Sequence, residues 1–169
     1  MSRPALHMEA GRPDPRQFRN VIGSFATGIA IVTTSVDGEH YGMTVNSLTS
    51  VSLDPCMLLV CPRRGSTTGD AIQKRGEFAV NILADTQRDL SSRFVNAIAA
   101  RFNDLDLEFS GGGMPLLPGS VAHLCCRVAA VHPAGDHDIV LGEVLACSDR
   151  EGRPLVFHKG AFGAFRVED

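Results

Sequence analysis

Small polar side chains crowd one segment of the chain, residues 42–53, where they are mixed with apolar residues. Because successive side chains of a strand point to opposite faces, both faces of a strand here would carry hydroxyl or amide groups. Buried groups of this kind need hydrogen-bond partners, which a flat ligand with polar edges would supply. A barrel strand with one face in solvent explains the same residues without a ligand. The polar members of the segment are Thr44, Asn46, Ser47, Thr49, Ser50 and Ser52.

A second candidate site is the segment RRGSTT (63–68), which directly precedes a predicted helix. The N-terminus of a helix presents free N–H groups and the positive end of the helix dipole. Hydroxyl groups and arginines at that point would add donors and charge, so the segment suits a phosphate group. Ordinary helix capping is the alternative, because Thr67 and Asp70 have the spacing of a capping box.

The third candidate is the turn GDHD (135–138), in which His137 lies between Asp136 and Asp138. A histidine beside carboxylates has a charge that its surroundings can tune, and it could hydrogen-bond an amide or polarise a substrate. A solvated turn is the alternative. His132 lies close by in the sequence, but no second pair of ligands accompanies it, so we expect no metal site.

Several well-known catalytic and nucleotide-binding motifs are absent from the sequence. It contains no G-x-S-x-G or H-E-x-x-H motif, no Walker sequence ending in G-K-[ST], and no G-x-G-x-x-G behind a strand. A Rossmann domain is therefore not expected to be the source of any nucleotide binding.

The elements that must position these residues are mostly short strands. We predict strands over residues 29–36, 42–53, 56–61, 78–83, 121–132, 138–147 and 155–166, and a hairpin turn at Asp37-Gly38. Helices are predicted over 66–74 and over 86–99, the second with Leu90, Phe94, Val95 and Ile98 on one face. Short strands separated by turns favour a mainly β fold, a barrel with a few helices.

One more helix is predicted near the N-terminus. Asp14 and Pro15 have the pattern of an N-cap followed by proline at the first helical position, and Gly28 ends the helical pattern. We expect its apolar stripe to pack in the core. The stripe consists of Phe18, Val21, Ile22 and Phe25.

The composition is that of a globular protein, with 169 residues, 44% of them hydrophobic, and a net charge of −3. We predict a flexible arm over residues 1–13 and one domain over residues 14–169. The negative balance argues against binding to nucleic acids or to anionic membranes, and no apolar run is long enough to span a bilayer. The N-terminus lacks an apolar signal-peptide region, so we expect a cytoplasmic protein.

Taken together, these segments resemble the short-chain flavin reductase family over about residues 16–166. The resemblance implies an FMN-binding split β-barrel that commonly forms a homodimer. It rests on the order and spacing of TGIAIVTT (27–34), GMTVNSLTSVSLDPCMLLVC (42–61), STT (66–68), FAVNIL (78–83), the Gln87…Leu90-Ser91…Phe94 pattern, GDH (135–137), LGEV (141–144) and PL (154–155).

The resemblance also implies roles for individual residues. The edge of the isoalloxazine ring would contact Thr44, Val45, Asn46 and Ser47, and the flavin would continue along Ser50, Val51 and Ser52. The flavin phosphate would lie near Ser66, Thr67 and Thr68, and Phe94 would lie close to the flavin. His137 would lie near the nicotinamide and is the predicted catalytic residue. The sequence departs from the family at His158 and Lys159, where many members carry arginine with tyrosine.

The activity that the resemblance implies is reduction of FMN or FAD by a reduced nicotinamide. NADH is favoured over NADPH, because no arginine cluster stands out that could bind a 2′-phosphate. The reduced flavin would pass to a separate flavin-dependent monooxygenase. One alternative is a split-barrel oxidase or flavin-binding protein without reductase turnover. Another is a docking barrel that binds no flavin.

Overall fold

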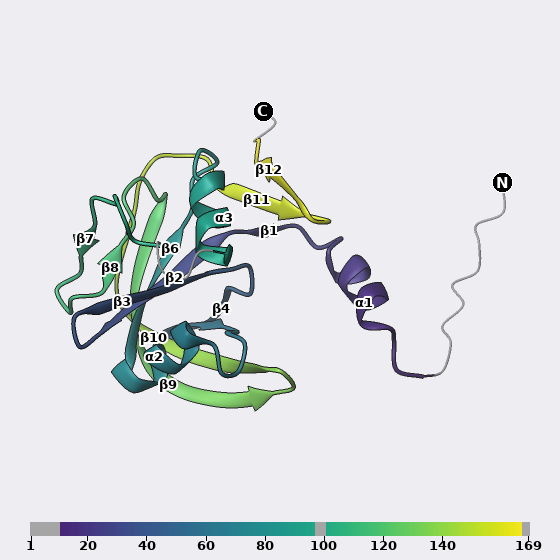
Figure 1. Ribbon diagram of the computed structural model, residues 1–169, viewed down its shortest axis with the longest axis horizontal. Helices are drawn as coiled ribbons and strands as arrows, with labels where there is room; N and C mark the ends of the chain where they lie inside the picture. Colours follow the sequence, from purple (N-terminus) through teal and green to yellow (C-terminus); the bar gives the residue numbers. More distant parts are fainter. Residues whose placement is uncertain (1–10, 97–100, 167–169) are drawn as a thin grey trace.

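The computed structural model describes residues 11–96 and 101–166, and in these ranges the chain is mainly β (Figure 1). The helices are α1 (Pro15–Ile22), α2 (Thr67–Arg75) and α3 (Arg88–Asn96), and among them none is long and apolar enough to cross a membrane. The strands are β1 (Thr27–Gly28), β2 (Ala30–Val36), β3 (Glu39–Val45), β4 (Thr49–Leu53), β5 (Cys56–Val60), β6 (Glu77–Ile82), β7 (Glu108–Phe109), β8 (Pro115–Leu116), β9 (Ala122–Ala134), β10 (His137–Asp149), β11 (Leu155–His158) and β12 (Ala161–Ala164).

The consecutive strands β3 and β4 form opposite edges of one antiparallel sheet, whose order is β3-β2-β6-β9-β10-β5-β4. Laid flat at the usual strand spacing, such a sheet would hold its two edges about 29 Å apart. The chain from Val45 to Thr49 spans at most about 14 Å. The sheet must therefore curl until its edges approach each other, which produces the barrel. We call the connecting residues 46–48 the seam linker.

The curled sheet encloses one apolar core, and a second core lies beneath α3. Strand β2 contributes to both, because its side chains alternate: Ala30 and Val32 belong to the barrel core, whereas Ile31 belongs to the core with Phe94 and Leu83. This double burial explains why β2 begins with three successive apolar residues, Ala30, Ile31 and Val32. The prediction of a barrel-like, mainly β fold with a few helices is confirmed.

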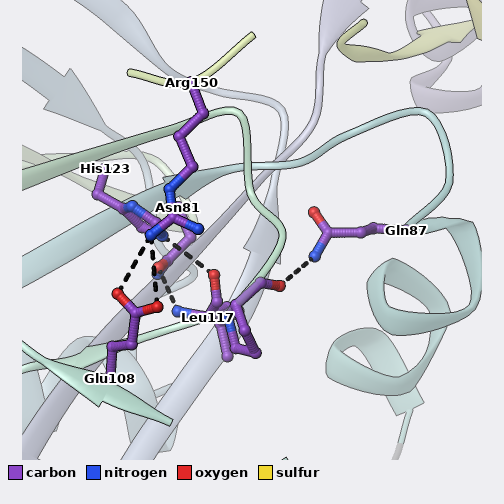
Figure 2. Close-up of polar contacts among 7 residues, drawn as sticks. Asn81, Gln87, Glu108, Leu117, His123 and Arg150 are labelled. Carbon is purple, nitrogen blue, oxygen red and sulfur yellow. Dashed lines mark hydrogen bonds and ion pairs between the residues drawn. The ribbon is translucent and has the colours of Figure 1, made fainter. Parts of the chain in front are cut away.

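Buried polar side chains fasten the glycine-rich segment before β9 to the barrel (Figure 2). The Asn81 side chain donates to the carbonyl oxygen of Ile31 at 3.0 Å and accepts the N–H of Leu117 at 2.8 Å. The imidazole of His123 donates from Nε2 to the carbonyl oxygen of Leu117 at 3.0 Å. Gln87, just before α3, donates to the carbonyl oxygen of Pro118 at 2.8 Å. Hydrogen bonds to the N–H and the carbonyl oxygen of Leu117 and to the carbonyl oxygen of Pro118 thus hold this segment over the second core.

Two predicted strands turn out to be pairs of strands. The predicted strand 42–53 breaks at the seam linker, because the chain must cross there from one edge of the sheet to the other. The predicted strand 155–166 is the hairpin β11–β12, which turns at Lys159 and Gly160 with φ of 48° and 82°. The predicted hairpin at Asp37-Gly38 is confirmed, with φ of 52° and 83° at the two turn residues.

The helix α3 matches its prediction only in part. It begins at Arg88, Phe94 is buried and Leu90 packs partly against the same core, but Val95 is exposed. Ile98 lies outside the described residues. The α2 prediction is confirmed within a residue at each end, because Ser66 caps the helix and the left-handed Gly76 ends it.

The helix α1 contradicts its prediction in two ways. It ends at Gly23 rather than Gly28, and its apolar stripe does not enter the core: Val21 is 67% exposed and Phe25 is 73% exposed. In Figure 1, α1 stands beside the barrel, next to β1 and the β11–β12 hairpin. Helical periodicity shows that a face is apolar, but it cannot say whether this chain or another surface covers that face.

Candidate functional site

A cavity of about 650 Å³ opens at the seam, between the seam linker, the end of α1 and the turn of the β11–β12 hairpin. We call it the seam cavity. Its polar side comes from Asn46, Ser47 and Thr49. Its apolar walls include Ile22, Phe25, Leu48 and Phe157. Apolar walls with a few polar groups are typical of a binding site for a small molecule.

Ser47 fixes the polar side of the seam cavity. Its hydroxyl accepts the backbone N–H of Cys61 at 3.0 Å, which ties the seam linker to the end of β5. Asn46, one residue earlier, is exposed and lines the cavity. Of the predicted ring-binding residues, these two therefore lie where a ligand in the cavity can reach their side chains.

Thr44 and Val45 direct their side chains into the protein instead. The Thr44 hydroxyl donates to the carbonyl oxygen of Ser91 in α3 at 2.7 Å, and Val45 belongs to the barrel core. Their side chains position the start of the seam linker. The backbone contacts that the sequence resemblance implies for these residues stay a prediction.

The predicted continuation of the site lies along β4. Ser50 and Val51 are exposed, and the Ser52 hydroxyl accepts the N–H of Asp54 at 3.2 Å in the β4–β5 turn. None of these three residues lines the seam cavity. Thr49, which the sequence analysis counted among the polar residues but gave no role, is the member of β4 that does.

The N-terminus of α2 is capped one residue earlier than the predicted Thr67–Asp70 capping box, because Ser66 and not Thr67 is the N-cap. The Ser66 hydroxyl accepts the N–H of Gly69 at 3.2 Å and so caps the helix. Thr67 is exposed, whereas Thr68 is buried. Thr67 and Thr68 line a second cavity, of about 450 Å³, together with residues 39–42 and 101–103. Neither threonine lines the seam cavity.

The turn that carries His137 lies beside the loop that leads into α2. The N–H of Arg64 donates to the carbonyl oxygen of Asp136, and the N–H of Asp138 donates to that of Pro62, each at 3.0 Å. Arg63 also forms an isolated antiparallel bridge with His137. Two candidate segments that are about seventy positions apart in the chain thus meet at one place.

His137 is oriented by its neighbour. Its Nδ1 lies 2.9 Å from Asp136 Oδ1, and this hydrogen bond, followed by the charge of His137, lowers the pKa of the Asp136 carboxyl. The carboxylate can only accept, so Nδ1 carries the proton, and Nε2 of the neutral ring is left as an acceptor. The His137 side chain is partly exposed, so this nitrogen can meet a ligand.

Phe94 does not reach the surface. Its side chain is 1% exposed and packs edge-to-face with Phe102, with 5.0 Å between the ring centroids. It also lies directly under β3, where a Cβ added to Gly42 would come within 2.6 Å of the ring. The aromatic ring supports β3 from within the core, and its predicted proximity to a flavin stays untested.

Sequence reasoning gave no role to several residues that line the seam cavity. The hydroxyl of Thr27 is buried and has no hydrogen-bond partner in the described part of the chain, although Thr27 borders the cavity. Arg19, Phe157 and Lys159 also line it. These residues come from separate segments, so no local spacing could have grouped them. An unpartnered buried hydroxyl is a polar atom that a ligand would satisfy.

The seam cavity offers little for nucleophilic or acid–base chemistry. Among the described residues no carboxylate lines it, and burial raises the pKa of the neighbouring Cys61 thiol, which keeps that thiol protonated at neutral pH. Burial likewise raises the pKa of Cys126 to about 12. Within residues 11–96 and 101–166, no group of three histidines, cysteines or carboxylates is placed to hold a metal ion. The cavity is therefore suited to binding and aligning a ligand.

Comparison with known proteins agrees with this description. The flavin reductase like domain matches residues 22–166. The FMN reductase (NADH) SmoA of Agrobacterium fabrum is 45% identical over 155 residues, which are 92% of this chain and 88% of SmoA. The reductase subunit HsaB of a flavin-dependent monooxygenase from Rhodococcus jostii is 41% identical over 88% of this chain and 77% of HsaB.

Solved structures show the same architecture. The NADH:FAD oxidoreductase SgcE6 of Streptomyces globisporus superimposes with a TM-score of 0.87 and 33% identity over 95% of this chain and 99% of SgcE6. The flavin reductase PheA2 gives a TM-score of 0.86 and 35% identity over 92% of this chain and all of PheA2. The split-barrel fold predicted from the sequence is confirmed, and the chain belongs to the flavin reductase like family.

Proposed function

We propose that this protein reduces FMN or FAD with a reduced nicotinamide, NADH in preference to NADPH, and supplies the reduced flavin to a separate flavin-dependent monooxygenase. The seam cavity is the observation that carries the proposal, because its apolar walls, with polar groups from the seam linker, suit a flavin ring. Relatives named as an FMN reductase (NADH) and as the reductase subunit of a flavin-dependent monooxygenase support it.

The residues of the seam cavity fit the ring system of a flavin. Asn46 offers a side-chain amide and Ser47 a hydroxyl to the polar edge of the ring. Phe157 and Leu48 provide apolar walls. When both nucleotides are bound, the nicotinamide supplies a hydride and the flavin accepts it. The protein's part is to align the rings and exclude water.

The phosphate of the flavin would bind at the N-terminus of α2. Ser66 already accepts one N–H of the first turn, while the exposed Thr67 and the arginines at 63 and 64 add donors and positive charge. The Ser47–Cys61 hydrogen bond connects the seam linker to the strand end from which this loop departs. Contacts from Thr44, Val45, Ser50, Val51, Ser52, Thr68 and Phe94 stay predictions.

His137 would hold the nicotinamide. It lies beside Arg63 at the entrance to α2, and its Nδ1 hydrogen bond to Asp136 holds the ring and leaves Nε2 as the acceptor of the neutral form. An acceptor there can take a hydrogen bond from the carboxamide of the nicotinamide. This role is one of orientation, because hydride transfer between two bound rings needs no protein acid or base.

We also propose that the protein is a homodimer and that the exposed stripe of α1 takes part in the contact. Phe18, Val21, Ile22 and Phe25 form a face too apolar to be left in water without a partner.

Sedimentation measures the mass of the protein in solution. A species of 36 kDa, about twice the 18.1 kDa chain mass, would support the dimer, and an 18.1 kDa species would contradict it. The cytoplasmic location stays a prediction.

The reductase activity itself is tested by mixing the purified protein with NADH and added FMN or FAD in the absence of oxygen. We expect NADH absorbance to fall only when flavin is added, and the flavin absorbance band to decrease at the same rate. The flavin that gives the faster rate, FMN or FAD, is the preferred one, and NADPH is expected to react more slowly than NADH. Measurable flavin binding without NADH consumption would contradict the proposal and favour a flavoprotein without reductase turnover.

An isosteric pair of variants tests the phosphate site. Ser66→Asp and Ser66→Asn both retain a good helix cap, so both should unfold at the wild-type temperature. Only Asp adds a negative charge against the phosphate, and we expect it to raise the FMN dissociation constant at least about tenfold. Fluorescence quenching of FMN measures both constants. Equal affinities for the Asp and Asn variants would show that the phosphate binds elsewhere.

His137→Ala removes the side-chain acceptor and should raise the KM for NADH about fivefold, the value of one hydrogen bond. The FMN dissociation constant should stay within about twofold of the wild type. His132→Ala, on the neighbouring strand β9, is the matched control. A comparable loss of FMN affinity and NADH affinity in the His137 variant would refute the orienting role.

A further inference from the structure

The helix α1 forms one wall of the seam cavity, yet little within the described part of the chain holds it there. Arg19, Asn20 and Ile22 line the cavity, but none of the eight helix residues is buried. Beyond its own turns, the backbone of α1 and its C-cap is joined to the described barrel by one hydrogen bond, from the N–H of Lys159 to the carbonyl oxygen of Gly23 at 2.9 Å. A helix this short is marginal in water without packing, so this wall needs further support.

The exposed face of α1 is the place where such support can act. Phe18 and Val21 are 58% and 67% exposed, and neither of them lines the seam cavity. They lie on the same two turns as Ile22, which does line it. A surface that covers Phe18 and Val21 would therefore fix the cavity wall without entering the cavity.

A second uncovered apolar surface lies where β4 turns into β5. We call residues 51–56 the β4–β5 corner. Leu53 is 89% exposed and Val51 is 47% exposed. The strand β4 pairs with β5 on one side and with none of the described strands on the other. An open strand edge that exposes apolar side chains tends to be covered by another surface.

The charges beside these two surfaces are opposite. Arg16 and Arg19 lie on α1, whereas Asp54 directly follows Leu53 and residues 42–62 contain no lysine, arginine or histidine. None of these three charged residues forms an ion pair with a described residue. An apolar helix face with arginines thus complements an apolar corner with a carboxylate, and such complementarity favours association.

We propose that the β4–β5 corner of a second copy of this chain packs on the exposed face of α1, and that this contact completes the seam cavity. A two-fold axis repeats the contact, so one dimer covers both helices and both corners. The inference rests on the proposed function, which places the flavin ring in the seam cavity and α1 in a dimer contact. It adds the surface that α1 meets and a link between dimerisation and flavin binding.

The link has a measurable consequence. Because the dimer holds α1 against the cavity, the dimer binds flavin more tightly than the monomer does. By the same linkage, bound flavin strengthens the dimer. FMN affinity should therefore depend on protein concentration, although no residue of the dimer contact needs to touch the flavin.

Three single variants test the proposal. V21Q and L53Q each polarise one of the two surfaces, and neither residue lines the seam cavity. V95Q is the matched control, because Val95 is an exposed valine on α3 that also does not line the cavity. Glutamine is a good helix former, so V21Q and V95Q should leave their helices intact. Sedimentation gives the dimer dissociation constant of each protein, and fluorescence quenching gives its FMN dissociation constant at the same concentration.

At a concentration where the wild type is dimeric, we expect V21Q and L53Q to be largely monomeric. Their FMN dissociation constants should rise at least about fivefold, while V95Q should match the wild type in both measurements. Raising the concentration of V21Q until it dimerises should restore its FMN affinity, which a local defect in the cavity would not do.

Three results would overturn the inference: a monomeric V21Q that binds FMN as tightly as the wild type, an L53Q variant that dimerises like the wild type, or a wild-type FMN affinity that stays constant on dilution into the monomer range. Failure of the proposed function is distinct, because the wild-type dimer would then bind no flavin or consume no NADH when flavin is added.

Discussion

Residues 46–48 connect β3 and β4, the two edge strands of one sheet. Because this connection is short, β3 can stay paired with β2, and β4 with β5, only if the sheet curls. A flat sheet would hold those edges about 29 Å apart, roughly twice the reach of the chain between Val45 and Thr49. Curling is therefore a requirement of connectivity, and the buried side chains of β2 and β6 fill the space that it encloses. The Ser47–Cys61 hydrogen bond fastens the seam where the edges approach.

The seam is also where the fold leaves room for a ligand. The β11–β12 hairpin and the end of α1 approach the seam linker without filling the space beside it, so a cavity remains that both apolar and polar side chains line. The chemistry expected there needs little from protein acids and bases. Its side chains instead supply hydrogen bonds, apolar contact and positive charge, which suits a site that aligns two cofactors whose own rings react.

Local patterns in the sequence predicted most elements, because each depends on near neighbours. The β-branched run of β2 and the Asp37-Gly38 turn follow from side-chain alternation and backbone conformation, whereas the predicted capping box at Thr67 lies one residue after the actual cap, Ser66. The polar residues of 42–53 were predicted to form a candidate ligand site, and Asn46 and Ser47 line the seam cavity. The family resemblance and the split-barrel fold were also predictable, because they rest on the order of many such segments.

What could not be predicted depends on contacts between distant segments. The break at 46–48 follows from the order of strands in the sheet, which no local window contains. The stripe of α1 was assigned to the core because periodicity cannot identify the surface that covers it. Thr27, Phe157 and Lys159 meet only through the fold, and the same folding places Thr67 and Thr68 on a different cavity from Ser47.

A crystal structure of the protein with FMN bound would test the central claim most directly, namely that closure of the barrel at residues 46–48 creates the flavin-binding site. The account predicts the isoalloxazine ring in the seam cavity, with its polar edge at Asn46 and Ser47 and Phe157 on the apolar side. A ring seated instead in the cavity formed by residues 39–42, 67–68 and 101–103 would contradict it.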